Sequence, residues 1–133
     1  MQRVLLIDDE ETVGAATKIL LEREGFEVVL AENGRAGLSA MEAGGFDLAI
    51  VDLFMPGMDG LETASRLRRI NPTLPIVAMS GFMFRGECPP MPQFSTMAQE
   101  AGAQATLYKP FRPHELLQAI RVVRVASQDR QTA

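Results

Sequence analysis

The sequence has 133 residues, which is the size of one domain of the usual ~100–200 residues, and 47% of them are hydrophobic, enough for a buried core. Thirteen Lys and Arg side chains against seventeen Asp and Glu give a formal net charge of −4, whereas a nucleic-acid-binding surface needs a basic stripe. No apolar run approaches the ~20 residues that span a bilayer, and the single cysteine, Cys88, cannot form an internal disulfide, so we expect a cytoplasmic protein that binds no nucleic acid and does not insert into a membrane.

Short apolar runs alternate with longer amphipathic segments, a pattern typical of a parallel sheet covered by helices on both faces. The predicted strands are, in chain order, Val4–Ile7, Phe26–Ala31, Leu48–Val51, Ile76–Met79 and Ala105–Tyr108. The predicted helices are about Glu11–Glu24, Gly34–Glu42, Gly60–Ile70 and Arg112–Ala126. The first, third and fourth strands are apolar throughout and are expected at the centre of the sheet, with the other two nearer its edges.

The segment after Ser80 interrupts this pattern. Three prolines within residues 89–92 forbid a regular helix, so a fourth helix is expected to be short or displaced, between about Phe94 and Gly102. The same loop is rich in Met and Phe and either forms an adaptable contact surface or folds back over the sheet edge. We predict one domain over residues 1–126, followed by a polar, frayed tail over residues 127–133.

Polar side chains follow four of the predicted strands. They are Asp8 and Asp9, Asp52, Ser80 and Lys109. Because the crossovers make the strands parallel, these residues share the carboxyl edge of the sheet, where ligands bind in open α/β folds. Clustered carboxylates repel one another unless a cation lies among them, and Mg²⁺ accepts carboxylate and phosphate oxygens. The sequence therefore predicts a magnesium site beside a phosphoryl group, with Lys109 as the second positive charge.

Four motifs at these strand ends carry a family resemblance. They are Ile7-Asp8-Asp9-Glu10, Val51-Asp52-Leu53-Phe54-Met55-Pro56-Gly57-Met58-Asp59-Gly60, Met79-Ser80-Gly81 and Tyr108-Lys109-Pro110-Phe111. In this order they resemble the receiver domain of two-component response regulators, over roughly residues 1–125. The resemblance implies a flavodoxin-like, doubly wound, five-stranded parallel sheet in the order 2-1-3-4-5. It also implies a phosphoacceptor role in two-component, or phosphorelay, signal transduction.

The resemblance implies a role for each acidic residue. Asp52 would be the nucleophile that takes a phosphoryl group from a phosphohistidine on a sensor histidine kinase or a phosphotransfer protein. Asp9 and Asp52, with the backbone carbonyl of Phe54, would hold Mg²⁺, and Asp8 would act on the ion through water. The protein would not be an enzyme in the usual sense, because it would catalyse only its own phosphorylation and dephosphorylation by positioning and charge neutralisation.

The resemblance also covers the hydroxyl and the lysine. Ser80 would bond one phosphoryl oxygen, Lys109 would pair with another, and the bond between Lys109 and Pro110 would be cis. Receivers usually carry an aromatic switch residue three positions before the lysine, and that position is Thr106 here. Tyr108 is adjacent to Lys109, and its side chain is expected to point to the face of the strand opposite that of Lys109, because side chains alternate. Coupling between Ser80 and an aromatic side chain would then be absent, altered or located elsewhere.

Two functions of different classes follow from these observations. The first is a single-domain phosphoacceptor that switches a contact with a downstream protein, because the seven residues after Ala126 are too few for an output module, unless the chain is part of a longer protein. The alternative is a degenerate, phosphate-independent receiver that acts as a protein interaction module, which Thr106 and the unusual loop favour and the intact acidic site opposes. A metal-dependent phosphatase similar to haloacid dehalogenases fits poorly, because Phe54 cannot supply the proton of a general acid.

Overall fold

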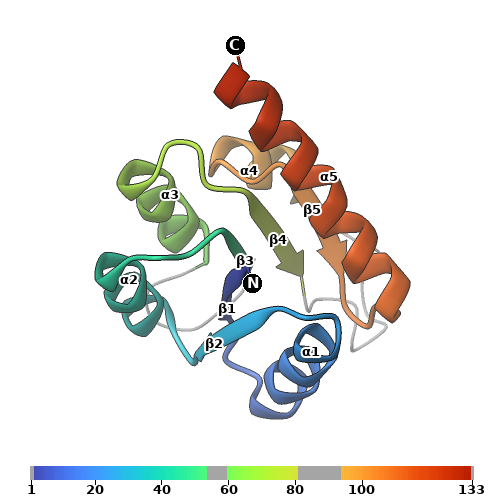
Figure 1. Cartoon of the computed structure of the whole chain (residues 1–133). Helices are drawn as coiled ribbons and strands as arrows, with labels where there is room; N and C mark the ends of the chain where they lie inside the picture. Colours follow the sequence, from blue (N-terminus) through green and yellow to red (C-terminus); the bar gives the residue numbers. More distant parts are fainter. Residues whose placement is uncertain (1, 54–59, 81–93, 133) are drawn as a thin grey trace.

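Within the described residues, five strands and five helices alternate in sequence, and Figure 1 shows their arrangement. The computed structural model describes residues 2–53, 60–80 and 94–132. The strands are β1 (Arg3–Ile7), β2 (Glu27–Ala31), β3 (Leu48–Asp52), β4 (Ile76–Ser80) and β5 (Ala105–Tyr108). The helices are α1 (Glu11–Arg23), α2 (Gly34–Ala43), α3 (Gly60–Ile70), α4 (Phe94–Glu100) and α5 (Pro113–Thr132).

All five strands pair in parallel, in the order β2-β1-β3-β4-β5, which confirms the predicted flavodoxin-like sheet with β2 and β5 at its edges. The register places Ile7 beside Val51, and Ser80 beside Tyr108. The carboxyl ends of neighbouring strands are therefore nearly level. Whatever residue follows each strand reaches the same edge of the sheet.

Helices cover both faces of the sheet, because the side chains of each strand alternate between two cores. Helices α2, α3 and α4 lie on one face and α1 and α5 on the other (Figure 1). Leu5 and Ile7 belong to the core beneath the first group, and Val4 and Leu6 to the core beneath the second. These four side chains are fully buried. A Leu, Ile or Val side chain buried in this way contributes about 1.5–3 kcal/mol. The uninterrupted apolar runs of the central strands are thus required by burial on both faces.

Most boundaries agree with the sequence prediction to within one residue, and the differences at the ends of β3, β4 and α5 have physical reasons. Asp52 and Ser80 are the last residues of β3 and β4, one position beyond the predicted ends, because each still pairs with the neighbouring strand. Helix α5 continues to Thr132 instead of ending at Ala126, because residues 127–132 contain neither Gly nor Pro to stop it.

Within the described ranges, no helix combines the length and apolarity needed to cross a membrane.

Helix α4 is short, as predicted, with seven residues. The Pro- and Met-rich segment that precedes it falls almost wholly within residues 81–93, which lie outside the described residues together with 54–59. The predictions made for Phe54 and Cys88 lie in these ranges.

Arg68, near the end of α3, links this helix by hydrogen bonds to the turn that follows it and to the turn before β5. Its guanidinium donates hydrogen bonds to the carbonyls of Asn71 (3.4 Å) and Pro72 (2.8 Å) in the turn after α3, and to that of Gly102 (2.5 Å) before β5. Gly102 has φ +102°, and a Cβ atom there would come 2.9 Å from Arg68 Nε. Glycine is therefore needed at this position both for the backbone angle and for the close approach of the guanidinium.

We expect Arg68→Ala to lower the free energy of unfolding by about 1–3 kcal/mol, because it leaves backbone carbonyls without their donors. Urea unfolding followed by circular dichroism measures the loss. Arg69→Ala is the matched control, since Arg69 is exposed in the same last turn of α3, and its effect should stay within about 0.5 kcal/mol. Equal losses in the two variants would contradict the role given to Arg68.

Candidate functional site

Backbone hydrogen bonds that run one residue beyond the strands position the side chains at the carboxyl edge. The N–H of Asp8 donates to the carbonyl of Ala31 (3.1 Å), and the N–H of Lys109 donates to that of Ser80 (2.8 Å). Asp52 needs no such extension, because it is itself the last residue of β3. The sheet therefore fixes Asp8, Asp52 and Lys109 relative to one another before their side chains interact.

The Lys109 ammonium lies among three carboxylates. Its Nζ atom is 2.8 Å from Asp8 Oδ2, 3.0 Å from Asp52 Oδ2 and 3.4 Å from Glu10 Oε1. Lys109 is 0% exposed, and Asp8 and Asp52 are each 1% exposed, so the site is a buried ionic cluster. Three carboxylates and one ammonium give it a formal charge of −3 + 1 = −2.

Burial by itself would lower the pKa of the Lys109 ammonium, but its carboxylate neighbours outweigh that effect. The close contact with Asp8 and the charges of Asp52 and Asp8 raise the pKa of Lys109 above its ordinary value. Lys109 is therefore positively charged throughout the neutral range. On the alkaline side, its attraction for the carboxylates is lost as the pH rises through this raised pKa.

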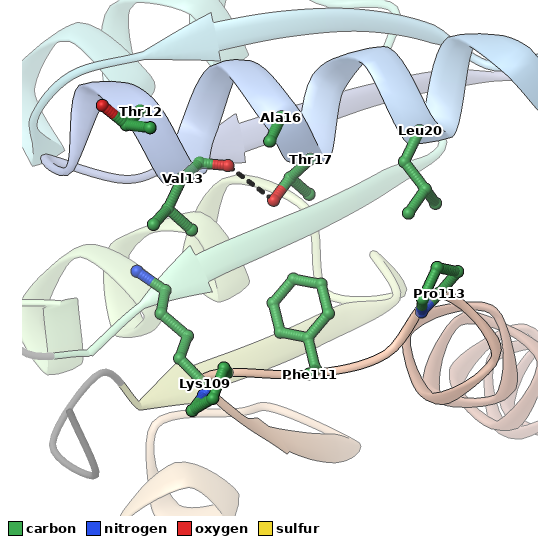
Figure 2. Close-up of a pocket in the computed structure, with 9 residues that line it drawn as sticks. Thr12, Val13, Ala16, Thr17, Leu20, Lys109, Phe111 and Pro113 are labelled. Carbon is green, nitrogen blue, oxygen red and sulfur yellow. Dashed lines mark hydrogen bonds between the residues drawn. The ribbon is translucent and has the colours of Figure 1, made fainter.

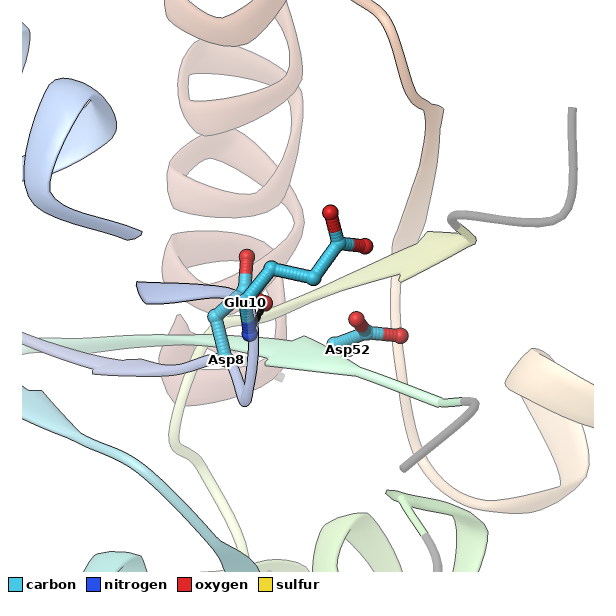
Figure 3. A group of neighbouring side chains, drawn as sticks. All are labelled: Asp8, Glu10 and Asp52. Atoms are coloured by element: carbon cyan, nitrogen blue, oxygen red, sulfur yellow. Dashed lines mark hydrogen bonds between the residues drawn. The ribbon is translucent and has the colours of Figure 1, made fainter. Parts of the chain in front are cut away.

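The acidic residues fit a magnesium ion. The side chains of Asp8, Glu10 and Asp52 lie close together (Figure 3), and one carboxylate oxygen from each lies within 4.8 Å of the others. Carboxylate oxygens are the ligands that Mg²⁺ prefers, and the formal charge of −2 on the cluster would be balanced by a divalent cation. Asp9, the other predicted ligand, is exposed at the turn between Asp8 and Glu10. The predicted carbonyl ligand, that of Phe54, lies outside the described residues.

Glu10 has no predicted role, although it belongs to the first of the four motifs. The backbone N–H of Glu10 donates to Asp8 Oδ1 (2.9 Å), which closes a tight turn immediately before α1. Glu10 is the N-cap residue of that helix, yet its side chain makes no capping hydrogen bond. The carboxylate lies beside Lys109 instead. The signal in the sequence for this role of Glu10 was its position two residues after Asp8, since an Asp often forms such a turn.

The predicted switch residues lie on neighbouring strands. Ser80 is 3% exposed at the end of β4, in register with Tyr108. Thr106 is half-buried and lies two residues farther from the carboxyl edge than Tyr108 does. Tyr108 packs against the core beneath α2, α3 and α4, whereas Leu107 packs against the opposite core. Because side chains alternate along β5, Thr106 and Tyr108 share one face of the strand.

An apolar cavity of about 390 Å³ adjoins the ionic cluster (Figure 2). It lies between α1 and the segment that joins β5 to α5, and its lining residues are Thr12, Val13, Ala16, Thr17, Leu20, Lys109, Pro110, Phe111 and Pro113. The Thr17 hydroxyl donates to the carbonyl of Val13 (2.8 Å), so this polar group of the wall is satisfied within α1. The peptide bond between Lys109 and Pro110 is cis, as the resemblance implied.

The sequence matches the family model of the response regulator receiver domain over residues 4–121. The chain therefore belongs to the receiver domain family of two-component response regulators. This is the class of protein in which a strand-end aspartate, an acidic pair and a lysine were expected to meet.

Two curated bacterial proteins are similar to most of this chain. The chain is 33% identical over 118 residues to the uncharacterized transcriptional regulatory protein YkoG of Bacillus subtilis, covering 89% of this chain and 49% of that protein. It is 32% identical over 123 residues to the transcriptional regulatory protein CpxR of Escherichia coli, covering 92% of this chain and 49% of CpxR. The chain thus spans about half the length of these curated relatives.

Solved structures agree with this assignment. A CheY-like receiver domain protein from Methanospirillum hungatei superposes with a TM-score of 0.85 at 28% identity, covering 98% of both chains. The response regulator TrrA from Thermotoga maritima, in complex with Mg²⁺-BeF, superposes with a TM-score of 0.78 at 30% identity, covering 92% of this chain and 99% of TrrA.

Proposed function

We propose that this chain is a phosphoacceptor switch in which Asp52 receives a phosphoryl group from a phosphohistidine. The buried contact of 3.0 Å between Asp52 and the ammonium of Lys109 carries the proposal. A carboxylate and a lysine are rarely fully buried without a reason, and here both lie at the edge of the sheet where α/β folds bind ligands. A similar receiver, TrrA, is known in complex with Mg²⁺-BeF.

In the proposed reaction, an oxygen of Asp52 attacks the phosphorus atom. The new O–P bond forms as the N–P bond of the donor breaks, and the electron pair of that bond leaves with the imidazole nitrogen. Lys109 and the Ser80 hydroxyl each contact a phosphoryl oxygen and so neutralise and orient the transferred group. The fixed backbone positions of these residues make the site ready before the donor arrives.

Asp9 and Asp52, with the carbonyl of Phe54, would hold Mg²⁺, and Asp8 would act on it through water. When bound, the ion would neutralise the negative charge that the phosphoryl group brings to the carboxylates. The formal charge of −2 at the cluster supports this requirement, because without a metal ion a further dianion would meet three carboxylates balanced by a single ammonium.

The donor would be a sensor histidine kinase or a phosphotransfer protein. Its phosphohistidine must approach the carboxyl edge of the sheet. The donor protein would contact the apolar cavity beside Lys109 as it does so. The downstream contact would be with a protein. The names of YkoG and CpxR suggest that transcriptional regulation is the setting.

The proposal is tested by intact mass after incubation with acetyl phosphate and Mg²⁺. We expect the parent protein to gain one phosphoryl group and Asp52→Asn to gain none, because the nucleophilic oxygen is lost. Chelation of Mg²⁺ should also prevent the gain. Asp47→Asn is the matched control, because Asp47 immediately precedes the opposite end of β3, and it should be phosphorylated as the parent is.

One observation favours the second candidate, a phosphate-independent interaction module. Thr106 stands where an aromatic switch residue is expected, so the coupling of Ser80 to an aromatic side chain at that position is missing. A folded parent that gains no phosphoryl group from acetyl phosphate, and none from a phosphorylated phosphotransfer protein, would contradict the first function and make the interaction module the one to pursue.

A further inference from the structure

Carboxylate oxygens crowd the Lys109 ammonium. Its Nζ donates hydrogen bonds to Asp52 Oδ2 (3.0 Å) and Glu10 Oε1 (3.4 Å), and Asp8 Oδ2 lies 2.8 Å away as an ion-pair partner. In the proposed function, Lys109 must also contact a phosphoryl oxygen. One of the three carboxylates therefore has to give up its place when the phosphoryl group arrives.

The structure distinguishes the three carboxylates. Asp8 is held on both sides, because its Oδ1 accepts the backbone N–H of Glu10 (2.9 Å) and its Oδ2 contacts Lys109, and its side chain is 0% exposed. Asp52 must remain because it carries the phosphoryl group. Glu10 makes the longest contact, and its side chain is 40% exposed. It also has three rotatable bonds and no capping hydrogen bond to helix α1.

We propose that the Glu10 carboxylate is the exchangeable counter-ion of Lys109, which occupies the place of a phosphoryl oxygen until the phosphoryl group displaces it. Glu10 is thus a positioning residue that acts through Lys109: it keeps the ammonium aimed into the site and competes with the incoming group. This inference rests on the proposed phosphoacceptor function of Asp52.

The test compares Glu10→Gln with Glu11→Gln, using beryllofluoride as the probe that imitates a phosphoryl group. Glutamine keeps the backbone N–H that orients Asp8 and nearly the shape of the side chain, but removes the charge. Glu11 is the matched control, because it is an exposed glutamate in the first turn of α1, next to Glu10. Calorimetry gives the dissociation constant of beryllofluoride at saturating Mg²⁺ and, separately, that of Mg²⁺ alone.

Glu10→Gln is expected to bind beryllofluoride about two- to fivefold more tightly than the parent, the value of a half-exposed ion pair that no longer competes. The same variant should bind Mg²⁺ alone about two- to fivefold more weakly, because one carboxylate of the cluster is neutralised. Glu11→Gln should match the parent in both. Opposite shifts of the two constants could not arise from a general loss of structure.

Two results would overturn the inference, and they are distinguishable. If the parent binds beryllofluoride but Glu10→Gln binds it no more tightly than Glu11→Gln does, Glu10 does not compete for Lys109, and the function of Asp52 is untouched. If neither the parent nor Glu11→Gln binds beryllofluoride in the presence of Mg²⁺, the phosphoacceptor function itself fails, and the role of Glu10 fails with it.

Discussion

Replacing Lys109 with methionine is expected to lower the free energy of unfolding by about 3–5 kcal/mol in magnesium-free buffer. Methionine fills much of the space of the lysine stem, so the loss comes from charge rather than from packing. The substitution leaves the buried carboxylates of Asp8 and Asp52, together with that of Glu10, without their shared cation. Added Mg²⁺ should restore part of the loss, because the ion supplies a positive charge at the same carboxylates.

Urea unfolding with and without Mg²⁺ measures both effects. Lys18→Met is the matched control, since Lys18 is the other lysine of the chain and lies half-buried on α1, and its effect should stay within about 0.5 kcal/mol. A loss for Lys109→Met no larger than that of the control would refute the view that this ammonium stabilises the cluster.

The pH dependence of this difference has a definite sign. The pKa of Lys109 is raised in the folded protein, so its contribution to stability is fully present below the pKa of an unfolded lysine. The stability difference between parent and Lys109→Met should therefore hold steady from about pH 7 to 9 and decline only as the pH rises through the raised pKa.

The second large effect is expected from Gly60→Ala, which should lower the free energy of unfolding by about 3 kcal/mol. A Cβ atom on Gly60 would collide with the carbonyl oxygen of Asp52 and with the backbone of Leu53. These are backbone atoms at the end of a buried strand, so neither can turn aside as a side chain would. The substitution should also slow phosphorylation, because the atoms that must move belong to the phosphoacceptor residue.

Gly37→Ala provides the comparison for Gly60→Ala. A Cβ atom on Gly37, in α2, would meet only side-chain carbons of Ile7, and the helix would gain up to about 1 kcal/mol from the exchange of Gly for Ala. Its net effect should be clearly smaller in thermal or urea unfolding. Equal losses at the two positions would show that the approach of α3 to β3 is not the tight constraint described here.

The sequence was sufficient to predict most of the sheet, because burial on both faces forces continuous apolar runs such as Leu48–Val51. It was also sufficient to bring Asp8, Asp52 and Lys109 together, since parallel strands align their carboxyl ends. The extension of α5 to Thr132 lies beyond the prediction, because polar residues near a chain end indicate fraying, whereas those after Ala126 are also permissive for helix.

Glu10 was missed for a different reason. Strand alternation predicts which edge a residue reaches, but the direction of a side chain in a turn depends on that turn's hydrogen bonds. Here the bond from the N–H of Glu10 to Asp8 sets that direction. The close approach of Gly60 to β3 is likewise a three-dimensional contact, which a glycine at the start of a predicted helix indicates only in general terms.

The hydrogen bond from the N–H of Lys109 to the carbonyl of Ser80 has a mechanical consequence. It joins the backbones of two proposed phosphoryl-contacting residues, so a pull on either side chain is passed from one strand end to the other. Among the described strands, β5 pairs with β4 alone, so it offers less resistance to displacement than β4 does. A force applied at Asp52 would therefore be relieved by a shift of β5, and helix α5, which packs on the same core as Leu107, would register that shift.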